Sequence, residues 1–451
     1  MKRGDIIELK ITEIDPKGDG RGSVDEREVI VRRAVPGDQI SARVIKKRRG
    51  RIDAEIIELH QQEMPRIDVR CAHFGLCGGC RWQDIQYEDQ LLLKERMVRN
   101  ALNQFGFDDI PIQGIMQSVS AFFYRNKMEF SFGADPEGNV QLGLHVRGRF
   151  NRIFDVETCH LQSPLSNRIV QITRKLANQL ALSAYNLKTH EGILRFLVVR
   201  DAKASGQILV NLVVSSYPHE GVETLVQHLI KEVPEIDSLV LTLHSGKAQV
   251  AKGEKEFVVS GRGAIEESCG KIHFDISPQS FFQTNSLQAE RLYQLIGEWA
   301  GDGLGRVLDL YCGTGSISLH MAHRAEEVLG IELVEDAVVD ARLNAERNGV
   351  ENCSFLVGKA EELLIEIAAK GDKYDLVVVD PPRPGLHKNV IEALGHMGPI
   401  RILYVSCNPE TLAENLCQLK EFGYEITRVQ PVDMFPQTPH CEVICELIKL
   451  D

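Results

Sequence analysis

The chain of 451 residues lacks the features of several protein classes. No apolar run reaches the ~18 residues that a membrane-spanning helix needs, and Met1–Asp5 is charged where a signal peptide has its apolar core. There is no low-complexity tract and no repeat with a period of about 20–50 residues. Hydrophobic residues make up 43% and charged residues 26%, which excludes collagen-like, disordered and disulfide-scaffold chains. We therefore expect a cytoplasmic protein of roughly two to four domains, with no membrane and no obligate protein partner.

Positive charge is scarce in the chain as a whole, but it is unevenly distributed. The net charge of −12 argues against a nucleic-acid-binding protein. Residues 1–60, however, carry a net charge of +2, against −14 in the remainder. Six cations and no acid lie between Arg43 and Arg51. Such a basic strip can bind phosphates on an acidic protein; the alternative is a solvated charge run.

Residues 1–60 have the pattern of a small β-domain. Polar and apolar residues alternate in Ile6–Ile14 and Gln39–Lys46, and Glu28–Arg33 is rich in β-formers. Turn residues fall at Pro16–Gly20 and Pro36–Asp38. This spacing predicts an antiparallel barrel of the oligonucleotide-binding kind, with a generic β-domain as the alternative.

The remainder divides into two parts. Residues 61–269 mix strands and helices and contain a cluster of cysteines. Residues 270–451 alternate helical stretches with short apolar runs, each typical of a buried parallel strand. These runs are Arg306–Leu310, Glu327–Ile331, Tyr374–Asp380 and Ile400–Ser406. We expect a doubly wound α/β domain there, with its ligand at the carboxyl ends of the strands.

The 11 cysteines include a group with ligand-like spacing. Cys77 and Cys80 flank two glycines, Cys71 precedes them, and Cys159 follows far downstream. The Cys-Gly-Gly-Cys turn lets two thiolates converge, and four thiolates suit tetrahedral zinc or an iron–sulfur cluster. Spacing alone does not separate these two metals. The alternative is a set of unrelated cysteines near a turn.

A strand followed by a Gly-x-Gly turn predicts a nucleotide-like cofactor. The run from Val307 leads into Gly313-Thr314-Gly315, and Glu332 ends the next expected strand. A carboxylate there can accept hydrogen bonds from both ribose hydroxyls. The third glycine of the dinucleotide fingerprint is absent, which fits S-adenosylmethionine because that ligand has no pyrophosphate. A tight turn without a ligand is the alternative.

Three further strand ends carry reactive side chains. Asp380 ends an apolar strand before Pro381-Pro382-Arg383, and Cys407 lies between a strand and a helix that begins at Pro409. The helix N-terminus would favour the thiolate form of Cys407. Glu442 follows a proline-punctuated loop and precedes an apolar strand, so it could be a general base. The alternative for Asp380 is a polar strand cap, for Cys407 a buried structural thiol, and for Glu442 a solvated loop end.

Taken together, these motifs resemble the RNA uracil-5-methyltransferases, and most closely the bacterial iron–sulfur enzymes that modify 23S ribosomal RNA. The resemblance covers the whole chain. It rests on the four-cysteine pattern and on Asp-Pro-Pro-Arg, Ser-Cys-Asn-Pro and the segment Phe274–Asn285. It implies a multidomain α/β fold: a TRAM RNA-binding barrel (1–60), a central α+β iron–sulfur domain (61–269) and a Rossmann-like S-adenosylmethionine methyltransferase domain (270–451).

The resemblance also implies a role for each site residue. Cys407 would be the nucleophile that adds to C6 of uracil, and Glu442 the base that removes the C5 proton. The implied contacts with S-adenosylmethionine are Gln283, Tyr311, Glu332 and Asp380. The implied ligands of a [4Fe–4S] cluster are Cys71, Cys77, Cys80 and Cys159. One departure is Lys359, where the family has a polar acceptor for adenine.

The expected activity is methylation of uracil C5 in 23S ribosomal RNA, with the target base flipped out of its stack. Phe122–Arg125 is a candidate contact for that base, or a partly buried aromatic strand. A transfer RNA methyltransferase of the same fold is the nearest alternative. A non-catalytic RNA-binding factor is a further alternative, but binding alone needs neither Cys407 nor Glu442. A dinucleotide-dependent oxidoreductase is another, but the third glycine of its fingerprint is absent.

Overall fold

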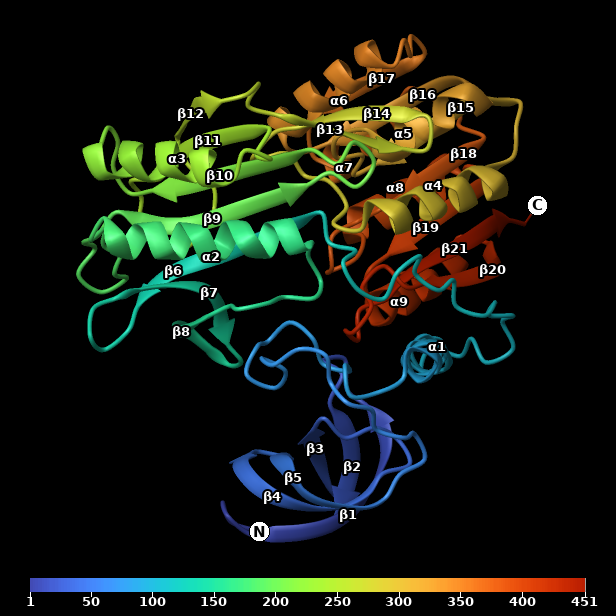
Figure 1. The fold of residues 1–451 in the computed structure, drawn as a ribbon. Helices are drawn as coiled ribbons and strands as arrows, with labels where there is room; N and C mark the ends of the chain where they lie inside the picture. The colour runs from blue at the N-terminus through green and yellow to red at the C-terminus, as the bar shows by residue number, and fades with distance from the viewer. Residues whose placement is uncertain (451) are drawn as a thin grey trace.

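The computed structural model describes residues 1–450. Its N-terminal part is a closed five-stranded barrel with strand order β1-β2-β3-β5-β4, which confirms the predicted barrel (Figure 1). The barrel is not antiparallel throughout, as predicted, because β3 and β5 pair in parallel. Inward-facing Ile7, Leu9 and Ile11 alternate with exposed residues and fill its core, as a half-buried strand requires. The basic strip lies on the β4–β5 hairpin. The barrel strands are β1 (Ile6–Ile14), β2 (Gly20–Val24), β3 (Arg27–Arg32), β4 (Gln39–Arg48) and β5 (Arg51–Gln61).

A mixed seven-stranded sheet forms the middle of the chain, in the order β12-β11-β10-β9-β6-β7-β8. Two helices, α2 (Pro164–Gln179) and α3 (Glu220–Glu232), share one apolar core with it (Figure 1). Its central strands β9 and β10 are buried along their whole length. The strands are β6 (Lys127–Ala134), β7 (Val140–Val146), β8 (Arg149–Asp155), β9 (Leu194–Asp201), β10 (Ile208–Val214), β11 (Ser238–Leu243) and β12 (Lys255–Ser260).

The C-terminal part is a seven-stranded sheet in the order β17-β16-β15-β18-β19-β21-β20. Strands β15 to β19 are parallel, while β21 runs antiparallel to β19. This is the doubly wound α/β arrangement that the alternating pattern predicts. A hairpin of β13 (Ile265–Cys269) and β14 (Ile272–Ile276) precedes it. The strands are β15 (Leu304–Leu310), β16 (Ala325–Glu332), β17 (Cys353–Val357), β18 (Leu376–Val379), β19 (Arg401–Ser406), β20 (Tyr424–Val432) and β21 (Glu442–Lys449).

Helices cover both faces of this sheet (Figure 1). Asn408 caps α9 with its side chain, and Pro409 occupies the first helical position, where its missing N–H costs nothing. The helices are α4 (Ser286–Ala300), α5 (Ser316–Met321) with a 3₁₀ turn at Ala322–Arg324, α6 (Glu335–Arg347), α7 (Ala360–Ala369), α8 (Lys388–Met397) and α9 (Pro409–Lys420).

One helix from the middle of the chain packs on the C-terminal sheet. Val98 and Leu102 of α1 (Tyr87–Asn103) belong to the same apolar core as the strands β15, β18 and β19. After α1 the chain runs beside β20, where Ile112 pairs with Val429. The domain limits 60/61 and 269/270 stay predictions, and the packing of α1 on the C-terminal sheet crosses the second of them. No helix among residues 1–450 is long and apolar enough to cross a membrane.

Candidate active site

The strand order gathers five predicted site residues at one edge of the C-terminal sheet. The parallel strands β16, β15, β18 and β19 end there, and the antiparallel β21 begins there. The residues at these ends, in strand order, are Glu332, Tyr311, Asp380, Cys407 and Glu442. Since neighbouring strands lie about 4.8 Å apart, these five strand ends span about 19 Å along the edge.

Cys407 and Glu442 are neighbours because of strand register. Ser406 of β19 pairs with Val443 of β21, and the two site residues are the next position on each strand. Burial, together with the nearby carboxylates of Glu442 and Asp380, raises the pKa of Cys407 to about 11. The helix position predicts a favoured thiolate, but in the structure burial and these negative charges outweigh the N-terminus of α9.

Two carboxyl groups at this edge, those of Glu442 and Asp380, have raised pKa values. Glu442 is 5% exposed, and burial, with a smaller effect from Asp380, raises its pKa to about 8. Burial raises the pKa of Asp380 to about 7. The guanidinium of Arg383 acts in the opposite direction on both Cys407 and Glu442. A carboxyl that titrates near neutral pH is suited to proton transfer.

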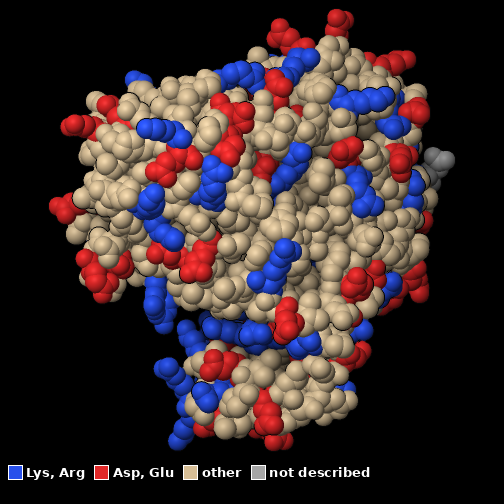
Figure 2. All heavy atoms as spheres, in the orientation of Figure 1, with Lys and Arg blue, Asp and Glu red and all other residues tan. Residues whose placement is uncertain are grey.

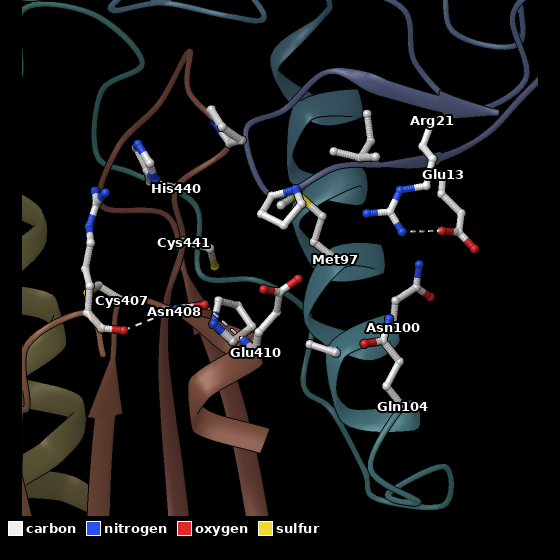
Figure 3. A pocket seen from close by; sticks show the side chains of 16 residues that line it. Glu13, Arg21, Met97, Asn100, Gln104, Cys407, Asn408, Glu410, His440 and Cys441 are labelled. Carbon is white, nitrogen blue, oxygen red and sulfur yellow. Dashed lines mark hydrogen bonds and ion pairs between the residues drawn. The ribbon is translucent and has the colours of Figure 1, made fainter. Parts of the chain in front are cut away.

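A cavity of about 220 Å³ opens beside Cys407 (Figure 3). Its far wall comes from the barrel, through Glu13 and Arg21, and from Asn100 of α1. Arg383 and His440 also line it. Sequence reasoning did not find these residues as parts of the site, because their contribution depends on how the barrel and α1 pack against the sheet. Only Arg383 had a signal, its place in the Asp-Pro-Pro-Arg motif.

The loop before Glu442 is anchored by a buried polar network. Lys94 and Asp433 are both fully buried, and Lys94 Nζ donates to Asp433 Oδ1 at 2.5 Å and to the Phe435 carbonyl at 3.1 Å. Tyr87 donates to the other oxygen of Asp433 at 2.7 Å. These contacts fix the start of the loop on α1. Helix α1 therefore helps to position Glu442, which follows the loop.

The middle of the same loop is held by side chains of α1 and of Tyr124. Gln90 Nε2 donates to Gln437 Oε1, and the Gln437 backbone N–H donates back to Gln90 Oε1, both at 3.0 Å. Tyr124, 2% exposed, donates to the Pro436 carbonyl. Tyr124 therefore secures the loop and is not an open surface for a base, whereas Phe122 and Phe123 are half-exposed beneath the guanidinium of Arg70.

The Gly-x-Gly turn folds over the ends of β15 and β16. Tyr311 has a positive φ of 66°, a costly conformation outside glycine. The Glu332 carboxylate accepts the Gly313 N–H at 3.1 Å and the Val334 N–H at 2.9 Å, which fixes its orientation. Gln283 lies in the loop before α4, where its carbonyl accepts Asn126 Nδ2. The same loop bonds to the turn through Thr314 and the Phe281 carbonyl.

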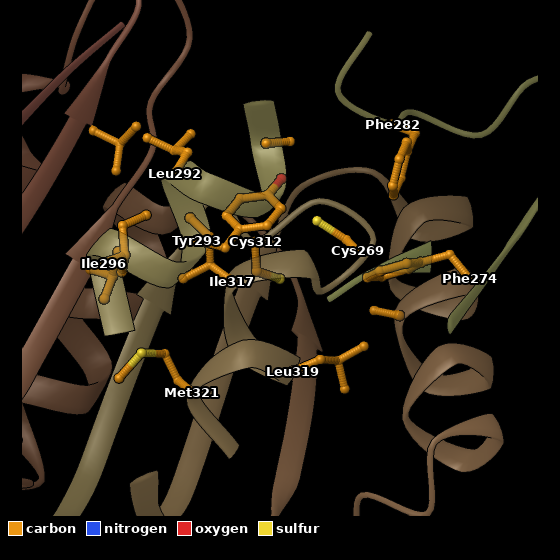
Figure 4. Close-up of a cluster of buried hydrophobic side chains, with 14 of the residues drawn as sticks. Cys269, Phe274, Phe282, Leu292, Tyr293, Ile296, Cys312, Ile317, Leu319 and Met321 are labelled. Carbon is orange, nitrogen blue, oxygen red and sulfur yellow. The ribbon is translucent and has the colours of Figure 1, made fainter. Parts of the chain in front are cut away.

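Apolar packing beneath this turn keeps it in place (Figure 4). Cys312 is 7% exposed and packs with Ile317 and Tyr293 in one core. Burial raises its pKa well above the ordinary thiol value. Cys312 is therefore a packing residue, and Cys445 is also buried, whereas Cys353 and Cys417 are half-buried.

The four clustered cysteines face a second cavity, of about 500 Å³, on loops below the central sheet. Cys77 Sγ accepts the Gly79 N–H at 3.3 Å. Gln83 accepts the N–H of Cys71 and Asn167 that of Cys159. Each of the 11 cysteines is free of a disulfide. The cavity thus brings together residues as far apart as 71 and 159.

The four thiols differ in how well they suit the two metal groups that their spacing leaves open. Within residues 1–450, no three His, Cys, Asp or Glu side chains converge closely enough to hold one metal ion. Four thiols around a roomy cavity suit a multi-iron cluster better than one tetrahedral zinc, because a cluster separates its thiolates by the width of its core. The [4Fe–4S] cluster stays a prediction.

The doubly wound sheet, its glycine turn and the acid that follows define a nucleotide-binding methyltransferase fold. The model of the tRNA (uracil-5-)-methyltransferase family matches residues 86–449. The chain belongs to this family of S-adenosylmethionine-dependent RNA uracil-5-methyltransferases.

Relatives match the chain over its full length. An uncharacterized RNA methyltransferase of Caldanaerobacter subterraneus is 39% identical over 100% of both chains. Another from Chlorobaculum tepidum is 37% identical, covering 98% of this chain and 96% of the relative. The crystal structure of Pyrococcus abyssi tRNA (uracil-54, C5)-methyltransferase with S-adenosyl-L-homocysteine matches with a TM-score of 0.77 and 27% identity, covering 98% of this chain and 100% of that one.

Proposed function

We propose that this enzyme methylates C5 of a uridine in 23S ribosomal RNA through a covalent bond between Cys407 and C6. The observation that carries the proposal is that Cys407 and Glu442 come directly after the paired residues Ser406 and Val443 at adjacent strand ends, and that Cys407 lines the 220 Å³ cavity. Uracil C5 is a poor nucleophile, so a group that activates it and a group that removes its proton are both needed.

In the first step the Cys407 thiolate adds its electron pair to C6. The C5–C6 π electrons move toward C5 and the O4 oxygen, which makes C5 nucleophilic. S-adenosylmethionine, when bound, supplies the sulfonium methyl that C5 accepts. Since the pKa of Cys407 is raised to about 11 in the free protein, Arg383 on the cavity wall must favour the thiolate as the RNA excludes water.

In the second step Glu442 removes the C5 proton. The C5–H electron pair re-forms the C5–C6 double bond, and the C6–S pair returns to Cys407. A base with a pKa of about 8 accepts a proton and releases it again near neutral pH. Protonated Asp380 could donate a hydrogen bond to the uracil ring or to the cofactor at the same edge.

The cofactor contacts follow from the strand ends. Glu332 keeps a free lone pair on each oxygen for the ribose hydroxyls, because each oxygen accepts one backbone N–H. Tyr311 and Gln283 lie on the two segments that Thr314 joins. We further propose that Cys71, Cys77, Cys80 and Cys159 hold a [4Fe–4S] cluster that organises the loops of the central part.

The mechanism is tested with RNA that contains 5-fluorouridine. Fluorine at C5 cannot be removed as a proton, so the protein should stay bound to the RNA after methyl transfer. We expect a complex that survives denaturing electrophoresis with the native protein and is absent in Cys407→Ala. An adduct of equal yield in Cys407→Ala would refute the assignment of the nucleophile.

A transfer RNA substrate is the second candidate, because the Pyrococcus abyssi enzyme that matches over 98% of this chain acts on tRNA. Mass mapping of ribosomal and transfer RNA from a strain lacking the gene separates the two. Loss of one methyl group from a 23S fragment supports the first proposal. Loss from transfer RNA alone would replace it with the second.

A further inference from the structure

The β7–β8 hairpin presents an aromatic side chain to solvent. Phe150 is 80% exposed, more than any other large apolar side chain among residues 1–450. It follows Arg149, and Asn151 and Arg152 come next, all of them exposed. A Phe in open solvent stabilises no core, so its ring is free to contact a ligand.

The local backbone pushes these residues out of the sheet. Val146 of β7 pairs with Arg149, but His145 pairs with Ile153, so Phe150–Arg152 has no partner strand. Bulges of this kind redirect side chains and are common next to functional sites. β8 is also the last strand of its sheet, with no neighbour beyond it.

The charges beside Phe150 are uncompensated. Arg147, at the base of the hairpin, donates to both oxygens of Asp19 at 2.8 Å. By contrast, neither Arg149 nor Arg152 forms an ion pair within the described part of the chain, residues 1–450. An unpaired guanidinium on each side of an exposed ring is the combination that proteins use to bind single-stranded nucleic acid.

The hairpin is fixed to the part of the molecule that carries the active-site cavity. The Arg147 N–H donates to the Leu76 carbonyl. Its ion pair with Asp19 joins it to the β1–β2 turn of the barrel. That same turn supplies Pro16 to the wall of the 220 Å³ cavity. The chain from Pro16 to Asp19 spans about 10 Å at most.

Lys and Arg side chains lie on both sides of the hollow where the barrel joins the rest of the molecule (Figure 2). Lys46 and Arg49 of the β4–β5 hairpin in the barrel have no ion-pair partner among residues 1–450. A nucleic acid strand leaving the cavity past the β1–β2 turn would therefore meet cations on either side.

We propose that Phe150 is a stacking site for an unpaired base of the substrate RNA, a few nucleotides from the target uridine, with Arg149 and Arg152 on the flanking phosphates. This inference rests on the proposed function. It adds a binding site on the central sheet that is separate from both the barrel and the catalytic edge. The site reads no particular base, because every base has a π-face.

The test measures binding, so it is independent of catalysis. The probe is a fluorescein-labelled oligouridylate of about 16 nucleotides, which covers an oligonucleotide-binding site, titrated in the presence of S-adenosylhomocysteine. Phe150→Ala should weaken binding about 5- to 100-fold, the effect of losing one base–aromatic stack. Phe150→Trp should restore it. The double variant Arg149→Gln, Arg152→Gln should reduce the slope of log affinity against log salt concentration by about 1.4, because two phosphate contacts of a single strand are lost.

Val258→Ala is the matched control. Val258 is 56% exposed on β12, the opposite edge of the same sheet, and its loss should leave the affinity unchanged. Equal binding by the native protein and Phe150→Ala overturns the stacking site alone. No RNA binding by the native protein overturns the proposed function as well. Unchanged RNA affinity with a loss of self-association in Phe150→Ala would assign the hairpin to a protein interface instead.

Discussion

The protein has two sites that present cysteine, and they are constructed differently. At the catalytic edge, Cys407 is placed by the register of β19 against β21, and the groups around it are carboxylates and one guanidinium. In the cysteine cavity, four thiols lie on loops, and one of them, the Cys77 thiol, accepts the Gly79 backbone N–H. A sheet fixes a side chain without any ligand. Loop thiols need a bound group to define their positions.

The largest expected effect is at the catalytic edge. Cys407→Ser should reduce methylation by on the order of 10⁴-fold or more, since the covalent step is lost, while the melting temperature stays within about a degree. Cys417→Ser, a half-buried thiol on the following helix α9, is the control and should keep full activity. Equal loss in both variants would mean that folding, and not the nucleophile, is affected.

Glu442→Gln should slow turnover by about 10²–10⁴-fold, the usual contribution of a general base, and a Cys407–RNA adduct should accumulate. The same carboxyl group also affects the stability of the native protein. Because the pKa of Glu442 is raised from 4.5 to about 8, its contribution falls as pH rises from 4.5 through 8.

Glu442→Gln lacks this titration. The difference in free energy of unfolding, variant minus native protein, should therefore be larger at pH 9 than at pH 5 by on the order of 1–4 kcal/mol. Chemical denaturation at the two pH values measures it. A difference that is independent of pH would remove the buried-carboxyl explanation.

The cysteine cavity should show the reverse pattern of effects. Cys80→Ser should lose iron and acid-labile sulfide after anaerobic purification. It should also melt about 5–10 °C lower, since about 2–4 kcal/mol changes the melting temperature by about 2–4 °C per kcal/mol in a domain of this size. Cys353→Ser, a half-buried thiol elsewhere, should change neither. Iron-free native protein of unchanged stability would contradict the cluster proposal.

The smallest expected effect sharpens the electrostatic side of the comparison. Arg383 lowers the pKa of both Cys407 and Glu442. Arg383→Gln should therefore move the rise of kcat/KM to higher pH by about one pH unit, and Arg383→Lys should restore it. The rate of Cys407 alkylation by iodoacetamide against pH gives an independent measure. A profile that does not move would assign Arg383 to RNA binding alone.

Most of the fold follows from local pattern. The apolar runs Arg306–Leu310 and Ile400–Ser406 predict strands β15 and β19 almost to the residue, because buried parallel strands have no polar face. The alternation in Ile6–Ile14 likewise matches β1. Helix α1 is a different case. Its residues Val98 and Leu102 pack in the core of the C-terminal sheet, which is distant in the sequence, so local pattern does not indicate what they contact.

The candidate site divides in the same way. The strand-end positions of Asp380, Cys407 and Glu442 are visible in the sequence as polar residues that border apolar runs. The wall made by Glu13, Arg21 and His440 is not, because it joins segments more than 400 residues apart. The fully buried Lys94–Asp433 pair is similarly invisible, since nothing local distinguishes a buried lysine from a solvated one.

The sequence by itself determined which residues can do chemistry and on which elements they lie, because periodicity, glycine turns and strand ends are properties of neighbouring residues. The tertiary structure alone decided the ionisation of those residues and the shape of the space between them. A thiol that the helix N-terminus would favour as thiolate has a raised pKa in the fold. Burial and charge are set by distant segments, and electrostatics depends on distance in space rather than on distance along the chain.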